Sequence, residues 1–438
     1  MGSFDRFIEL ISHGNYDEVI ELIDNDPNPT ERLLLFKSEA LIYNGSFDIA
    51  YQLVKPFTQS EDLLIKVDAI RQKSLIHWSL GEFNQAIELI ERAYDLLANL
   101  DETKLDDLSI KAHVLHMYGT ICQSTGQLDQ SLSFLKQSLS ISEDLGNQHR
   151  IAATLANLAI VHSYMGDQEK TLENYNSALI ILKDLGKSGD EALVLGLLGE
   201  TYWELGKKAE AIKYKIKSLD ILREFKNYYR IADSLYVLIN FLLLFNRNEL
   251  ANSYYNELVK VNKSSDAYNI DIMTRFAEGL ILKFSPRVKQ KIIAQGIFED
   301  LLEEELDFEI RSEILLHLSD LLIDELRTYS EPEVLVELNS LYNQIYQMAS
   351  NQNNRYLSTE ALILKAKMEI INTNFTEADR IFEEASLLAE KHAFDFLKDK
   401  AELERKLLQE DLVLWQTLLS KGASIKERID QSKIRDYL

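Results

Sequence analysis

The stretch Ile151–Leu185, IAATLANLAIVHSYMGDQEKTLENYNSALIILKDL, predicts two short helices separated by a glycine turn. Apolar residues such as Leu155 and Leu158 recur at helical spacing in its first half, and the same spacing resumes after Gly166. A helix commonly ends on a left-handed residue, a conformation that costs glycine least. The stretch therefore predicts an antiparallel helix pair that is too small to bury its own apolar face.

The pair is one unit of a repeat. Gly126, Gly166, Gly206 and Asn246 follow one another at intervals of 40 residues. Small residues recur in step with them where paired helices are expected to touch, at Gly119, Ala159 and Gly199. A fixed period of this length indicates a solenoid of stacked helix pairs.

Composition narrows the class of protein. The 438 residues are 46% hydrophobic and 27% charged, and the five prolines favour helix nearly throughout. A formal charge of -24 disfavours sequence-independent binding to nucleic acid or to anionic lipid. The single cysteine, Cys122, excludes an internal disulfide framework. No apolar run approaches the ~20 residues of a membrane span, so we expect a cytoplasmic protein without membrane insertion.

In each unit a small residue in the first helix is followed by a turn glycine and then by two small residues in the second helix. This order resembles the tetratricopeptide repeat (TPR), in its forty-residue variety. The chain is also similar to prokaryotic TPR proteins of unassigned activity. The resemblance implies an all-α, right-handed superhelix of antiparallel helix pairs. The expected units are degenerate pairs at 1–111, regular repeats at 112–287, an irregular helical segment at 288–355, a further pair at 356–395 and capping helices at 396–438.

In the TPR family the first helix of each pair lines a concave groove that holds peptides. The residues that the resemblance places in this groove are Trp78, His116, Asn157, Tyr164, Glu200, Trp203, Tyr236 and Asn240. Aromatic residues dominate interface hot spots, so the tyrosines and tryptophans are candidate anchors. Packing of Trp78 and Trp203 against the neighbouring repeat is the alternative, and the C-terminal helices could also fill the groove. The Lys/Asn/Arg clamp by which some TPR domains hold a carboxylate is missing.

A local excess of basic residues falls within 207–230. Four lysines of this segment are predicted to form a basic patch on the convex side: Lys208, Lys213, Lys215 and Lys217. Such a patch could dock a partner, or it could be a solvated helix face whose counter-charges lie on adjacent repeats. Seven acids between Glu299 and Glu309 could pair with the basic patch of a second copy.

No catalytic or nucleotide-binding motif is found, and no cofactor is expected. His113 and His116 lie three residues apart, but a histidine metal site needs more converging ligands, so no metal site is predicted. The predicted function is a non-catalytic scaffold, not an enzyme, that binds a peptide segment of an unidentified protein partner in its concave groove. The alternatives are a regulatory sensor or phosphatase-like protein and a self-assembling homo-oligomeric module.

Overall fold

The computed structural model describes residues 5–12, 15–101, 103–186, 188–225, 228–265, 267–329 and 332–422. These ranges are almost entirely α-helical and contain no strand. Consecutive helices pack as antiparallel pairs, and successive pairs stack side by side, which confirms the predicted all-α solenoid. The predicted short helix after Gly422 lies outside the described residues.

Each pair has a first and a second helix. The first helices are α1 (Asp5–Ser12), α3 (Glu31–Tyr43), α5 (Leu63–Ser79), α7 (Leu105–Ser124), α9 (Gln148–Tyr164), α11 (Ser188–Glu204), α13 (Tyr228–Leu244), α15 (Tyr268–Lys283), α17 (Phe308–Tyr329), α19 (Arg355–Ile371) and α21 (Asp395–Ser420). The second helices are α2 (Tyr16–Asp24), α4 (Phe47–Val54), α6 (Phe83–Leu96), α8 (Leu128–Asp144), α10 (Gln168–Asp184), α12 (Lys208–Phe225), α14 (Asn248–Lys263), α16 (Val288–Leu302), α18 (Pro332–Asn351) and α20 (Phe375–Lys391). Two single turns of 3₁₀-helix, Pro56–Gln59 and Leu97–Asn99, follow α4 and α6.

The two kinds of helix differ in how they are buried. In α13 every residue from Ile231 to Leu243 except Asp233 is buried. Its partner α14 buries only Ala251, Leu258 and Val261, which form one stripe. A helix that is buried all round lies inside a protein, whereas a helix with one apolar stripe covers its surface. The first helices therefore form the inner layer of the solenoid and the second helices form the outer layer.

The forty-residue period extends further than the sequence analysis indicated. First helices begin at Gln148, Ser188, Tyr228, Tyr268 and Phe308, each 40 residues after the one before. The next begins 47 residues later, at Arg355, because α17 and α18 have 22 and 20 residues where α9 and α10 have 17 each. The interval of 40 then returns at Asp395. The segment 288–355 thus continues the helix pairs, and α21 occupies the position of a first helix.

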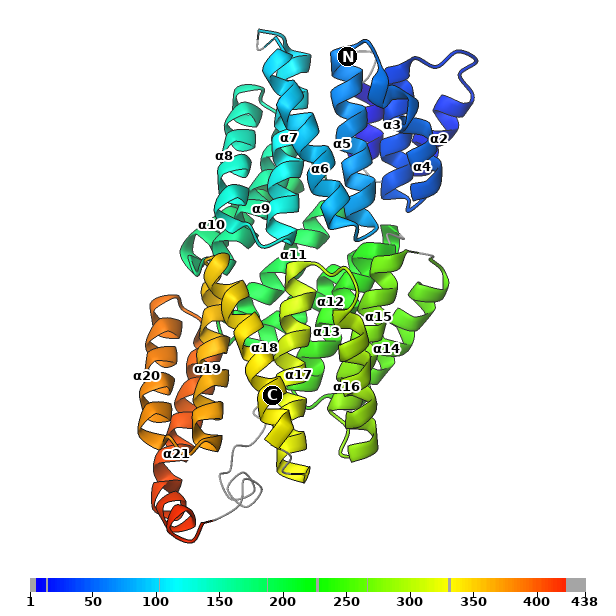
Figure 1. The fold of residues 1–438 in the computed structure, drawn as a ribbon. Helices are drawn as coiled ribbons and strands as arrows, with labels where there is room; N and C mark the ends of the chain where they lie inside the picture. The colour runs from blue at the N-terminus through cyan, green and yellow to red at the C-terminus, as the bar shows by residue number, and fades with distance from the viewer. Residues whose placement is uncertain are drawn as a thin grey trace.

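The solenoid coils tightly enough for its early and late repeats to touch. In Figure 1 the helices up to α10 form the upper part of the molecule, and α12 to α21 form the lower part. The Asn269 side-chain amide donates to the Ser79 carbonyl over 2.8 Å, and the backbone N–H of Asn84 donates to Glu305 Oε1 over 3.1 Å. His392 Nδ1 lies 3.0 Å from the Gly166 carbonyl oxygen. The turns that end the first helices of the upper part therefore rest on the lower part.

Within a pair, small residues bring the helices together. A Cβ atom added to Gly119 would lie 2.7 Å from Leu135 Cγ, and one added to Gly279 would lie 2.3 Å from the Phe298 ring. The Ser131 hydroxyl donates to the Gly119 carbonyl oxygen over 2.7 Å, directly across the α7–α8 contact. These contacts agree with the steric role predicted for the small positions.

Comparing Gly126 with Gly146 distinguishes two free-energy costs of a substitution: the strain of a left-handed turn, and a steric contact between the upper and lower parts. Gly126 and Gly146 have φ of +76° and +65°, so alanine is strained at both by about 1–2 kcal/mol. A Cβ at Gly126 would also lie 2.5 Å from the Phe308 ring, whereas nothing lies within 4 Å at Gly146. We expect Gly126→Ala to lower the free energy of unfolding by about 1–3 kcal/mol more than Gly146→Ala, measured by urea denaturation. Equal losses would show that the Phe308 ring moves aside at no cost.

Candidate functional site

The predicted groove residues in the upper part bond to one another across neighbouring first helices. Asn157 donates through Nδ2 to Thr120 Oγ1 over 2.9 Å, and that Nδ2 lies 3.3 Å from His116 Nε2. His116 Nδ1 is 3.1 Å from Thr154 Oγ1. Trp78 Nε1 donates to Ser124 Oγ over 3.0 Å. Trp78, His116 and Asn157 are half-buried and line one continuous inner surface from α5 to α9.

The aromatic residues predicted on α11 and α13 are more enclosed than a groove position requires. Trp203 is 4% exposed and stacks on Phe241, with ring centroids 4.2 Å apart and an interplanar angle of 5°. Tyr236 is 3% exposed and packs against Phe276 at 6.1 Å. Both residues lie on the inner helices as predicted, but they pack against the neighbouring repeats. For Trp203 the structure therefore shows the alternative to groove exposure, which is packing against the neighbouring repeat.

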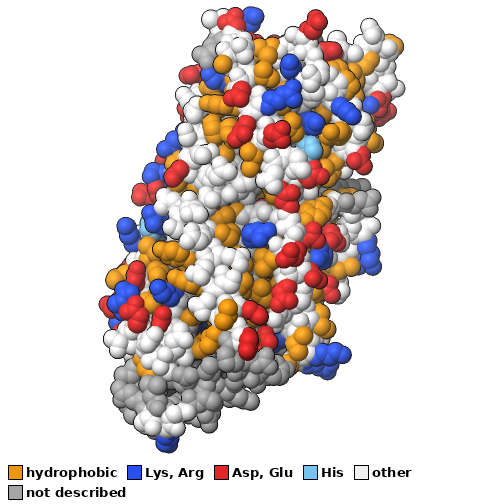
Figure 2. All heavy atoms as spheres, in the orientation of Figure 1, with side chains coloured by type: hydrophobic (Ala, Val, Ile, Leu, Met, Phe, Trp, Pro, Cys, Tyr) orange, Lys and Arg blue, Asp and Glu red, His pale blue; other side chains and the backbone are white. Residues whose placement is uncertain are grey.

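Lys215 does not belong to a convex basic patch. It is 1% exposed and forms an ion pair with Glu200, the groove residue of the adjoining first helix. Lys213 and Lys217 are exposed, and Lys208 lies 5.6 Å from the Trp203 ring centroid. The error arises because α12 is packed on more than one face, so lysines two residues apart point to different surroundings. On the face seen in Figure 2, acidic and basic side chains alternate in small groups.

Around α9 the inner surface carries a group of arginines. Arg71 pairs with Asp68 at 2.7 Å and with Glu39 at 3.7 Å, and Arg230 pairs with Asp190 at 3.0 Å. Arg150 differs, because its Nε atom is buried without a hydrogen-bond partner. Among the described residues, no carboxylate forms an ion pair with it. Burial lowers the Arg150 pKa, so this guanidinium is held at a cost in desolvation.

The histidines next to Arg150 stay neutral. Burial, followed by the charge of Arg150, holds the pKa values of His113 and His116 well below the ordinary range. Within the described ranges, no group of three or more histidine, cysteine or acidic side chains is arranged to hold a metal ion. Arg150 is thus the positive charge that a ligand on this part of the surface would meet.

Below the arginines lies an acidic cluster, contributed by α11, α13 and the start of α17. Its members are Glu200, Glu204, Asp233, Asp307, Glu309 and Glu313. Burial is the largest cause of the raised pKa values of Glu204, Asp233 and Glu313, which reach about 7, about 6 and about 8. Tyr164 donates to Glu309 Oε2 over 2.7 Å, and so connects α9 to α17. Buried carboxylates with raised pKa values are enriched at functional sites.

Glu313 and several neighbouring residues are absent from the predicted site because 288–355 was predicted to be an irregular segment without the repeat. The signal was present, since Glu313 lies 80 residues after Asp233 and Asp320 lies 80 after Asn240. Counting on from the start of α19 places Glu360 and Lys400 in the same register. These residues extend the inner surface through α17, α19 and α21.

Comparison with known proteins now gives the family. Tetratricopeptide repeat profiles match residues 111–184, and in a second form residues 70–96 and 192–221. This chain is a tetratricopeptide repeat protein. It is 26% identical to the photosystem I assembly protein Ycf3 of Prochlorococcus marinus, over 106 residues in strain NATL1A and 123 residues in strain MIT 9312. Those matches cover 24% and 28% of this chain, and 56% and 66% of the relatives' own length.

Solved structures share the TPR fold over most of the chain. A Rap protein complexed with Competence and Sporulation Factor superposes with a TM-score of 0.59 at 16% identity, covering 80% of this chain and 97% of that one. NprR in complex with its cognate peptide NprX gives 0.56 at 13% identity, covering 79% and 98%. The Rap conjugation regulator of plasmid pLS20 with the Phr* peptide gives 0.55 at 14%, covering 79% and 94%. At these identities the likeness establishes the fold alone.

None of the described helices of this TPR chain is both long and apolar enough to cross a membrane.

Proposed function

We propose that the protein is a non-catalytic interaction scaffold that binds a peptide segment of a partner on the inner surface of its first helices. The observation that carries this is a pair of ionisable side chains whose buried polar atoms the fold leaves without hydrogen-bond partners. Arg150 has a buried Nε without a partner, and Glu313 has a buried Oε2 without one. Leaving a buried donor or acceptor without a hydrogen bond costs about 1–3 kcal/mol, a cost that a structural role alone does not recover.

The arrangement suits an extended ligand better than a small molecule. Arg150 on α9 and Glu313 on α17 lie in different parts of the inner surface, and the half-buried Asn157 and Tyr164 are on α9 as well. A chain of several residues can contact both groups, with an acidic group at Arg150 and a hydrogen-bond donor at Glu313. Peptides bound to the same fold in the structures of the pLS20 Rap regulator and NprR support a peptide as the ligand class.

The test is selection of short peptides from a random display library on the wild-type protein, followed by affinities from fluorescence polarisation. We expect Arg150→Gln to weaken the selected peptides at least tenfold, because truncating one partner of a desolvated charge pair costs about 2–5 kcal/mol. Lys213→Gln and Lys217→Gln on the exposed side of α12 are the matched controls, and they should change the affinity less than twofold.

The opposite pattern would overturn the proposal. If the selected peptides lose affinity with the α12 variants and bind Arg150→Gln normally, the outer surface is the binding surface. A folded protein that selects no peptide at all would also contradict it.

A further inference from the structure

A cavity lies between the inner helices α11, α13, α17, α19 and α21. Its volume is about 130 Å³, and its lining includes Trp203, Asn240, Glu313, Tyr356 and Phe396. A cavity of ~150 Å³ is enough to hold benzene, whereas drug-sized ligands need about 300 Å³ or more. The cavity has the size of one side chain.

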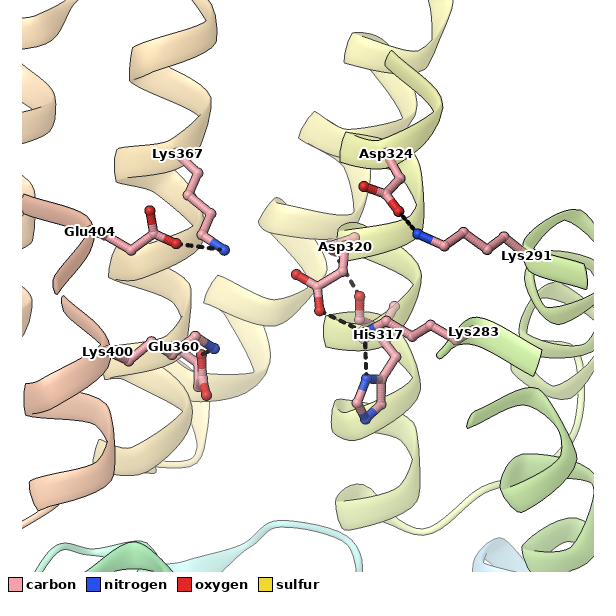
Figure 3. A network of polar contacts seen from close by, with 11 residues as sticks. Lys283, Lys291, His317, Asp320, Asp324, Glu360, Lys367, Lys400 and Glu404 are labelled. Carbon is pink, nitrogen blue, oxygen red and sulfur yellow. Dashed lines mark hydrogen bonds and ion pairs between the residues drawn. The ribbon is translucent and has the colours of Figure 1, made fainter. Parts of the chain in front are cut away.

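Three ion pairs around the cavity are already complete (Figure 3). Lys283 Nζ donates to Asp320 Oδ2 over 2.8 Å and lies 2.9 Å from His317 Nδ1. Lys400 donates to Glu360 Oε2 over 2.9 Å. Lys367 lies 3.3 Å from Glu404 Oε1. Burial and the Lys283 charge lower the pKa of His317, which stays neutral and accepts from the lysine.

One carboxyl group is left over. Among the described residues Glu313 has no cation within ion-pair distance, and its Oε2 atom is buried without a hydrogen-bond partner. A second oxygen in the cavity wall is in the same state. Asn240 is 8% exposed, so more than nine-tenths buried, and its Oδ1 atom has no partner. Both atoms are acceptors of the kind that a donor-rich ligand satisfies.

Two aromatic rings of the lining already have a cation near them. Trp203 packs against Phe396, with ring centroids 5.6 Å apart, and both rings lie in the lining. The Lys208 ammonium already lies 5.6 Å from the Trp203 centroid and 5.1 Å from that of Phe396. A cation near the face of such rings gains about 0.5–2 kcal/mol, with the larger gain where water is excluded.

We propose that this cavity takes the basic side chain of a lysine or arginine in the bound peptide, with its donors on Glu313 Oε2 and Asn240 Oδ1. The proposal rests on the proposed function in so far as the ligand is a peptide. It adds the chemistry of the ligand: a recognised peptide must carry one positive side chain at a fixed position. Arginine has five donors in a planar fork, so it can satisfy two acceptors at once.

Binding of a cation should displace a proton. Burial raises the Glu313 pKa to about 8, so the carboxyl group holds a proton at neutral pH and loses it when a positive charge arrives. The charged groups around it are Glu200 on α11, Lys215 on α12, Asp233 on α13, Asp307 just before α17, Glu309 on α17, and the paired Asp320, Glu360, Lys367 and Lys400. His317 is neutral and does not compete for that proton.

The experiment uses small ligands, so that it tests the cavity without any peptide. n-Butylguanidinium, n-butylammonium and the neutral n-butylurea are titrated into the full chain, and the Trp203 indole N–H signal is followed by NMR. We expect saturable shifts with one or both cations and none with the urea. Glu313→Gln should weaken the cations at least tenfold, while Glu337→Gln, at an exposed acid on α18, should leave them unchanged.

Calorimetry of the same titrations at pH 7 in two buffers of different ionisation enthalpy should show protons released by the wild type and none by Glu313→Gln. Equal binding of cation and urea, or cation binding unaffected by Glu313→Gln, would overturn the inference. Selected peptides that bind well with no basic residue in common would overturn it as well, yet leave the proposed function standing. If the cations bind but the protein selects no peptide, the proposed function fails and the inference about the cavity stands.

Discussion

Lys367→Met is expected to lower the free energy of unfolding by about 3–5 kcal/mol, because it leaves the charge of Glu404 buried without its counter-ion. The Lys367 and Glu404 side chains are only 6% and 2% exposed, and the pair joins α19 to α21 (Figure 3). Water cannot solvate the remaining carboxylate, so the carboxyl group must take up a proton or the helices must separate. Urea denaturation at pH 7 measures the loss.

Two controls fix the cause. The double variant Lys367→Met with Glu404→Leu removes both charges at similar volume, and should recover most of the loss. Arg380→Met breaks the Arg380–Glu377 pair of α20, whose side chains are 59% and 45% exposed, and should cost less than about 1 kcal/mol. A Lys367→Met loss as small as that of Arg380→Met would mean that the buried pair contributes no more than a surface pair.

Glu313→Gln is expected to stabilise the protein increasingly as the pH rises. The Glu313 pKa is raised from 4.5 to about 8, so the folded state binds more protons than the unfolded state between these values. The favourable contribution of the protonated carboxyl group is therefore complete below pH 4.5 and is lost as the pH rises towards 8. Glutamine cannot ionise and does not incur this loss. The free energy of unfolding of the variant should therefore exceed that of the wild type by about 2 kcal/mol or more at pH 8.

Thermal denaturation of both proteins from pH 5 to pH 8.5 tests the sign. The stability difference should be small at pH 5 and grow through pH 8. A matched substitution of the exposed Glu337 to glutamine should give a difference that does not change with pH. A Glu313→Gln difference that is constant, or that shrinks as the pH rises, would contradict burial of this carboxyl group.

The sequence predicts most of the fold because its signals are local. A turn glycine such as Gly166 and the small residues near it depend only on neighbours within one repeat. The period could also have been followed to Phe308 and, after one longer unit, to Asp395. The unit from Phe308 to Arg355 is seven residues longer than the others, which hides this continuity because the landmark positions lose their spacing together.

The candidate site was less predictable, since its contacts join residues far apart in the chain. Asn157 and Tyr164 were placed on the inner surface by their position in the repeat, but the Tyr164–Glu309 hydrogen bond spans 145 residues. Lys215 and Glu200 form a pair that composition cannot reveal, because both types are usually exposed. Whether a lysine covers the surface or neutralises a buried acid depends on how the superhelix coils. Their functional roles stay predictions.

The contacts between early and late repeats change how the molecule should unfold. An open repeat array has only nearest-neighbour interfaces, so its ends fray and its units melt in succession. Here the Ser79 carbonyl depends on Asn269, and the Gly166 turn lies against His392. Loss of a terminal pair therefore removes support from repeats near the middle of the chain. Because of the long-range contacts, amide hydrogen exchange in α5 and α15 should report one cooperative opening, as in a globular domain. In a linear array the protection from exchange would instead change gradually along the repeats.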